Sequence, residues 1–182
     1  QLEALTLPDS LTTIGEGALD GLTGLKKLVI QCDPAIIPAG VFANLPALSD
    51  VTIEFGAVPA HMFEGSGVTV LTLGAGVTEI GDSAFANTAL TSAEMQNVTA
   101  IGAGAFANTA LTSAEIQNVT AIGAGAFEGS ALERVQLNTA ASVGERAFAN
   151  TKLTKMVIPT AGSFPLSAVE GTSADLRLPA DA

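Results

Sequence analysis

The 182-residue sequence contains no tryptophan and no tyrosine, and it has one cysteine and one histidine. The single cysteine, Cys32, excludes an intramolecular disulfide framework and any zinc site built on several cysteines. The single histidine, His61, leaves little scope for catalysis that depends on imidazole. Without Trp and Tyr the chain lacks two of the residue types that most often dominate protein interfaces, and sugar binding by ring stacking has no support.

Positive charge is also scarce. Lys and Arg number 7 against 18 Asp and Glu, which leaves a formal net charge of −11. Binding to nucleic acid or to an anionic membrane surface requires a positive face, so we expect neither partner. Membrane insertion is not expected either, because the longest run without a charged residue, residues 95–114, is interrupted by polar side chains. No signal peptide is visible at the start of the chain, which does not indicate a cytoplasmic protein.

Internal repetition is what the sequence has in abundance. Residues 84–104 and 105–125 differ only at Met95 and Ile116, and weaker copies extend toward both ends with a period of 21–23 residues. Two apolar columns recur throughout. The first column holds Leu19, Phe42, Phe63, Phe85, Phe106, Phe127, Phe148 and Val169. The second column holds Ile14, Ile37, Val58, Ile80, Ile101, Ile122, Val143 and Phe164.

Each copy also contains a short run in which apolar and other residues alternate, typical of a strand with one face buried. These runs occupy residues 5–7, 28–30, 51–53, 71–73, 93–95, 114–116, 135–137, 156–158 and 176–178. Gly or Pro after the second column predicts the start of a single helical turn that ends at the first column. Gly or Asn follows two residues later, and these types tolerate the positive φ expected just after such a turn.

A repeat this small cannot bury its own apolar columns, whereas stacked repeats can. Strands that recur after each turn are expected to be parallel, and the coil right-handed. The sequence therefore predicts an α/β solenoid of about eight repeats, with short parallel strands on one face and single helical turns on the other. It predicts a single domain over residues 1–182.

The column pattern resembles the BspA-like leucine-rich repeats of bacterial cell-surface proteins, whose consensus reads roughly L-x-x-I-x-I-P-x-x-V-T-x-I-G-x-x-A-F. Residues 2–19 and 68–85 match best, and the resemblance covers essentially the whole chain. The proline after the strand survives only at Pro8, Pro159 and Pro179, and a cysteine often found after the A-F pair is replaced by Thr or Ser. The resemblance implies a right-handed leucine-rich-repeat solenoid, an extracellular or cell-surface location and no enzymatic activity. It also implies attachment to host extracellular-matrix proteins, host cells or other microbes.

The outward residues of successive strands should form a broad face, the usual interaction surface of repeat proteins. Its polar centre gives the candidate ligand-binding residues Glu94, Gln96, Glu115, Gln117, Arg134 and Gln136. Glu94 and Glu115 should lie on adjacent strands, where like charges destabilise by up to ~1 kcal/mol. One interpretation is a site for a partner's basic group or a cation. The other is a solvated, salt-screened pair that Arg134 on the next strand partly relieves.

Three functions remain open from the sequence. The first is a surface adhesion module that binds protein through the strand face, and the second is a passive spacer or stalk with no ligand of its own. The third is an enzyme built on a solenoid, such as a polysaccharide lyase, which requires a cluster of charged residues that only Glu94, Glu115 and Arg134 approach. We expect His61 to face solvent and Cys32 to be a small buried residue. No catalytic residue, metal site or cofactor is expected.

The apolar residues near both ends carry a further expectation. Leu2, Leu5 and Leu7 begin the chain, Leu176 and Leu178 nearly end it, and neither end has the polar outer face of a capping repeat. We therefore expect further repeats or another domain to flank this segment, or the ends to pair between molecules.

Overall fold

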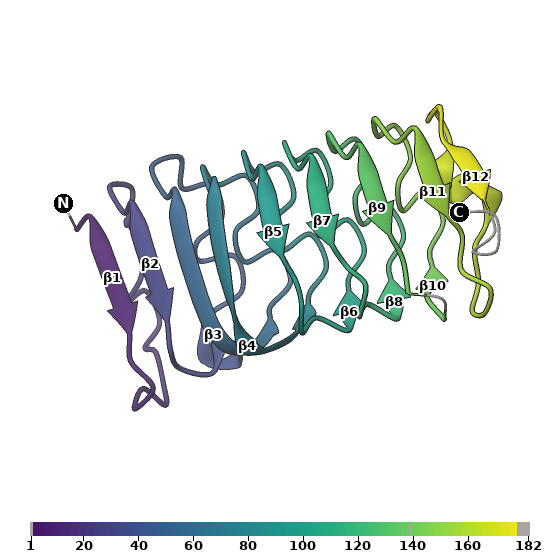
Figure 1. Ribbon diagram of the computed structural model, residues 1–182. Coiled ribbons are helices and arrows are strands. Elements are labelled where there is room, and N and C mark those ends of the chain that lie inside the picture. The colour runs from purple at the N-terminus through teal and green to yellow at the C-terminus, as the bar shows by residue number, and fades with distance from the viewer. Residues whose placement is uncertain (1, 139, 178–182) are drawn as a thin grey trace.

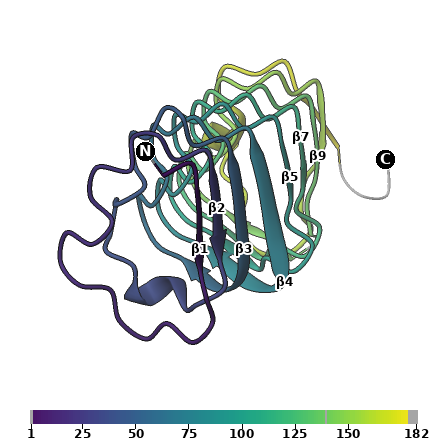
Figure 2. The ribbon, with the colours of Figure 1, turned by 90° about the vertical axis from the view of Figure 1, so that its left-hand side faces the viewer.

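A computed structural model describes residues 2–138 and 140–177 and shows a parallel β-solenoid of about eight coils (Figure 1). Viewed along its axis, the successive coils lie one behind another (Figure 2). The predicted repeat solenoid is confirmed. Within the described residues, each predicted strand begins one residue before the expected run. These strands are β1 (Ala4–Leu7), β2 (Lys27–Ile30), β3 (Asp50–Val58), β4 (Val70–Ile80), β5 (Ser92–Glu94), β7 (Ser113–Glu115), β9 (Arg134–Gln136), β11 (Lys155–Val157) and β12 (Asp175–Arg177). The last predicted run ends at Leu178, which lies outside the described residues, as does Pro179.

The strands pair in parallel, as the repeat predicts. They form two sheets, in the orders β1-β2-β3-β4-β6-β8-β10 and β12-β11-β9-β7-β5. The register follows the repeat period, so that Ser113 lies opposite Ser92 on one side and Arg134 on the other. A residue's place in the repeat therefore fixes its neighbours on the adjacent coils.

A second ladder of strands, not predicted from the sequence, runs through the second apolar column. It consists of β6 (Ala100–Ile101), β8 (Ala121–Ile122) and β10 (Ser142–Val143), which continue the far ends of β3 and β4. β3 and β4 extend around the bend from the first ladder into the second, and their pairing shifts register on both sides of Gly56, whose φ is 87°. In later coils the two ladders are separated by a turn such as the one closed by the Val98 N–H donating to the Met95 carbonyl.

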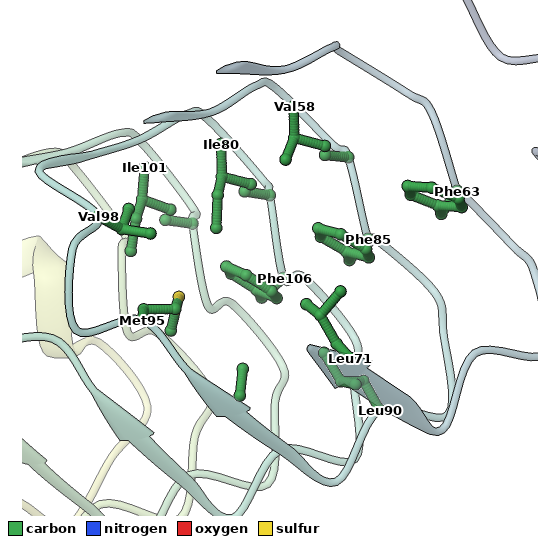
Figure 3. Packing of buried hydrophobic residues seen from close by; sticks show 14 of the residues in the cluster. Val58, Phe63, Leu71, Ile80, Phe85, Leu90, Met95, Val98, Ile101 and Phe106 are labelled. Atoms are coloured by element: carbon green, nitrogen blue, oxygen red, sulfur yellow. The ribbon is translucent and has the colours of Figure 1, made fainter. Parts of the chain in front are cut away.

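The two predicted columns form the core. The six phenylalanines of the first column are fully buried, and each ring stacks on the next with centroids 5.2–5.8 Å apart and planes within 10° of parallel. Figure 3 shows Phe63, Phe85 and Phe106 in one row, beside a second row formed by Val58, Ile80 and Ile101. Each coil thus covers the apolar surface that its neighbour cannot bury alone.

The side opposite the strands is built from tight turns. A short three-ten helix, η2 (Leu166–Val169), lies on this side, and in other coils bonds such as Ala84 N–H to the Gly81 carbonyl close single turns. The other three-ten helix, η1 (Pro34–Ile36), lies instead beside the bend of β3 at Gly56. The expected positive φ is confirmed at all eight Gly and Asn positions two residues after the first column: Gly21, Asn44, Gly65, Asn87, Asn108, Gly129, Asn150 and Gly171.

A second left-handed residue lies two positions before the first-column residue in most coils. Its backbone conformation prevents the turn from continuing as a longer helix. His61, Ser83 and Arg146 adopt φ between 52° and 58° there, and glycines occupy the same place in other coils. This backbone directs alternate N–H groups toward the next coil. The N–H groups of Ser83, Phe85 and Asn87 donate to the carbonyls of residues 103, 105 and 107. The turn side therefore contains its own ladder of hydrogen bonds between coils.

Candidate functional site: the strand face

The strand face consists of the outward side chains of the first strand ladder and of the next outward residue along the chain, which in the coil of β5 is Gln96, two places after Glu94. Alternation is regular: Ala93 and Met95 are buried, whereas Ser92, Glu94 and Gln96 are exposed. This is the pattern of a strand that packs one face on the core and presents the other to solvent. All six predicted site residues, Glu94, Gln96, Glu115, Gln117, Arg134 and Gln136, are exposed on this face.

The predicted acid pair is brought together. Glu94 and Glu115 lie directly opposite each other on the parallel strands β5 and β7. Neither carboxylate forms a salt bridge or side-chain hydrogen bond within the described residues. Two like charges directly opposite one another in a strand pair are unfavourable, so the acid pair lowers the stability of the folded chain.

Arg134 is placed beside the acid pair but is not bonded to it. It begins β9, opposite Ser113 on one neighbour and Lys155 on the other. In the part of the chain that the structure describes, Arg134 has no carboxylate within salt-bridge distance. Within the described residues Arg134 forms no ion pair with Glu115, and partial relief of the acid pair by its nearby charge stays a prediction.

Lys155 is a charged residue of the strand face that was not among the six candidate binding residues. It lies directly opposite Arg134 in the pairing of β11 with β9, and both side chains are exposed. The signal was present in the repeat, since both residues occupy the first position of their strands. The strand face thus carries an acid pair on β5 and β7 and a basic pair on β9 and β11.

A small hollow of about 70 Å³ adjoins Glu94 of the acid pair. Its lining comes from the middle of β4 and from β5 with the turn that follows: Leu73, Gly74, Val77, Glu94, Met95, Gln96, Asn97 and Val98. This space is large enough for ordered water or for the end of one side chain. The hollow forms because β4 continues around the bend, whereas the next coil leaves its strand and turns at Met95. The repeat period does not reveal this difference between the two coils.

A second hollow of about 260 Å³ lies beside the second ladder, next to Glu79 and Asp82. One oxygen of Asp82 accepts a hydrogen bond of 2.7 Å from the Ala103 N–H on the next coil. That carboxylate therefore joins two coils. As a result, fewer unbonded polar side chains are available beside this hollow than on the strand face.

Two other side chains with potential reactivity, Cys32 and His61, have the burial expected from the sequence. Cys32 is fully buried, and burial raises the pKa of its thiol, which disfavours the reactive thiolate. His61 is exposed, and its Nδ1 lies 2.8 Å from a carboxylate oxygen of Glu64. Among residues 2–138 and 140–177, no group of three or more His, Cys, Asp and Glu side chains is arranged to hold a metal ion.

The structure contains no candidate membrane span in its described range, because none of its helices combines sufficient length with sufficient apolar character.

Comparison with known proteins gives one clear relationship. A family model described as "BspA type Leucine rich repeat region" matches the chain in six copies, over residues 1–109 and 56–171. Together these matches span residues 1–171 of 182. No curated protein matches the chain.

Proposed function

The chain belongs to the BspA-type leucine-rich repeat family, and on that premise we propose that it is a non-catalytic adhesion module that binds protein through its strand face. Proteins of this family are generally repeat modules for protein interaction and are typically associated with bacterial surfaces. We place this chain outside the cell, with host extracellular-matrix or cell-surface proteins as its partners.

The observation that carries the proposal is the charged centre of the strand face. Glu94, Glu115, Arg134 and Lys155 are exposed on adjacent strands and, within the described residues, none has an ion-pair partner. By contrast, Lys26, Lys27, Arg146 and Arg177 are all in salt bridges. Charges left unpaired on a rigid surface are available to a partner and give it orientation.

The chemistry of the site favours binding over catalysis. Glutamine side chains at positions 96, 117 and 136 surround the charged residues, and amides donate and accept hydrogen bonds without acid–base activity at neutral pH. No aromatic side chain lies among the six candidate residues, so the expected contact is extended and polar rather than centred on an aromatic anchor.

Binding of the 182-residue chain to immobilised collagen, laminin and fibronectin, and to whole host cells, tests this proposal. Glu115→Lys and Arg134→Glu should each reduce binding at least tenfold, because each reverses a charge at the centre of the face. Glu145→Lys is the matched control for Glu115→Lys, since it makes the same change of charge at an exposed position on the turn side. Equal binding by all variants would show that the strand face is not the binding surface, and binding to none of these surfaces would favour the passive spacer.

A further inference from the structure

The strand face contains two like-charge pairs of opposite sign on four consecutive strands. The sheet order β11-β9-β7-β5 places the basic pair Arg134 and Lys155 on one side of a midpoint and the acid pair Glu94 and Glu115 on the other. Each pair consists of residues directly opposite each other in the ladder, where like charges cost up to ~1 kcal/mol. The isolated chain thus contains two unfavourable pairs whose charges are complementary to each other.

A two-fold rotation brings these pairs together between two molecules. When the axis lies in the plane of the face, parallel to the strands and midway between β7 and β9, β5 faces β11 of the second copy and β7 faces its β9. The acids occupy the third position of their strands and the bases the first, a separation of about 7 Å along the strand. Long Lys and Arg side chains extend over such a distance.

We propose that the strand face docks on the same face of a second copy of this chain, with Glu94 and Glu115 of each molecule bound by Arg134 and Lys155 of the other. This rests on the proposed function, that the strand face binds protein, and names a partner for it. A contact of this kind is isologous, because the same patch serves both molecules and the two-fold axis closes the assembly.

The surroundings of the four residues are compatible with this contact. Exposed Glu133 precedes Arg134, but the exposed and unpaired Lys152 lies one coil further on, so the basic half keeps an excess of positive charge. At about 0.15 M salt the Debye length is about 8 Å, which screens the repulsion between two chains of net charge −11 while charges in contact still attract. The four-strand patch covers roughly 200 Å² per molecule, well below the roughly 800 Å² of a standard interface, so we expect weak, reversible association.

Two double variants test the pairing. Glu94→Lys/Glu115→Lys makes all four positions basic, and Arg134→Glu/Lys155→Glu makes all four acidic. Sedimentation velocity at 0.15 M salt and increasing protein concentration should show weak self-association of the unaltered chain and monomers for each variant alone. An equimolar mixture of the two variants should form a one-to-one pair at least tenfold tighter than the unaltered dimer. Directly facing charges are opposite in both assemblies, but the diagonal neighbours across the axis (β7 with β7 and β9 with β9), which are alike in the unaltered dimer, are opposite in the mixture as well.

The control is Glu16→Lys/Glu145→Lys, which makes the same change of net charge at two exposed turn-side positions. Mixed with the acidic variant, it should show no such tightening. A mixture of the two face variants that associates no more than either variant alone would overturn the proposal, as would self-association of either variant at the level of the unaltered chain. Circular dichroism and thermal unfolding of each variant establish that it is folded.

Failure of this inference can be separated from failure of the proposed function. If the mixture does not pair but Glu115→Lys still abolishes binding to matrix proteins, the second copy is not the partner and the strand face still binds protein. If the mixture pairs and no matrix protein binds, the second copy is the partner and the host proteins are not.

Discussion

At the scale of single residues, the left-handed position two residues after each first-column residue restricts the sequence of every coil. Glycine and asparagine alternate irregularly there, and the spacing between coils explains part of the choice. A Cβ atom on Gly129 would lie 2.5 Å from the Oδ1 of Asn108 on the preceding coil, whereas Asn108 donates from its Nδ2 to the Oδ1 of Asn87 over 3.1 Å. Asparagine is thus accommodated beside asparagine when the side-chain amides can bond.

Substitution of Gly129 tests this restriction. Gly129→Ala should reduce the free energy of unfolding by about 1–2 kcal/mol, because φ is +68° and an alanine Cβ is disfavoured in that region. Gly129→Asn should cost less, since asparagine already occupies the equivalent positions 87, 108 and 150. Urea unfolding of both variants provides the comparison, and an alanine variant as stable as the asparagine variant would show that handedness does not limit this position.

The phenylalanine ladder gives a second prediction at this scale. Phe106→Ala should reduce the free energy of unfolding by about 3–5 kcal/mol, since it leaves a cavity between two stacked rings. Phe55→Ala is the matched control, because Phe55 is 40% exposed outside the ladder and should cost much less to truncate. Denaturant unfolding measures both, and equal losses would contradict the ladder as the main source of stability.

Structure at the scale of elements is where sequence reasoning was least complete. The main strands were predictable because three residues of alternating character recur with a fixed period. A two-residue strand such as Ala100–Ile101 shows no alternation, so the second ladder had no such signal. The left-handed residues that tighten the turns were equally hidden at Ser83 and Arg146, since neither residue type favours positive φ. Hydrogen bonds to the next coil, rather than local preference, select that backbone.

The pairing of β5 with β7 allows a prediction about charge. Glu115→Gln should raise the free energy of unfolding by up to ~1 kcal/mol at low salt and low protein concentration, because it removes repulsion from Glu94. The gain should disappear at 1 M salt, where the Debye length falls to about 3 Å. Thermal unfolding against salt measures this, with Glu145→Gln as the control on the turn side. A salt-independent effect, or a loss of stability at low salt, would contradict repulsion between the two carboxylates.

At the scale of the whole molecule, the repeat period predicted the composition of the candidate site but not its internal contacts. The period fixes register, so the outward columns and the facing of Glu94 and Glu115 followed from the sequence. The facing of Arg134 and Lys155 follows from the same register. The lack of an ion pair between Arg134 and Glu115 in the described part of the chain depends on side-chain geometry that the period does not specify. The hollow beside Glu94 depends on the continuation of β4 through the bend, which is particular to that coil.

The two sides of the solenoid differ in how their charged side chains are bonded. On the turn side, backbone hydrogen bonds and the bridge from Arg146 to Glu128 and Glu170 join successive coils. On the strand face the charged side chains at the centre remain unpaired within the described residues. We therefore expect the turn side to hold the stack together and the strand face to meet other molecules.

Selective blocking of each side tests that division most directly. Cys32 is buried with a raised thiol pKa, so a bulky maleimide should modify an introduced surface cysteine and leave Cys32 unmodified. Ser113→Cys places the label between the charged pairs of the strand face, and Ala124→Cys places it on the exposed turn side. Binding to matrix proteins and host cells should be lost when the first variant is labelled and retained when the second is labelled. Retention of binding after labelling at residue 113, or its loss only after labelling at residue 124, would contradict the strand face as the interaction surface.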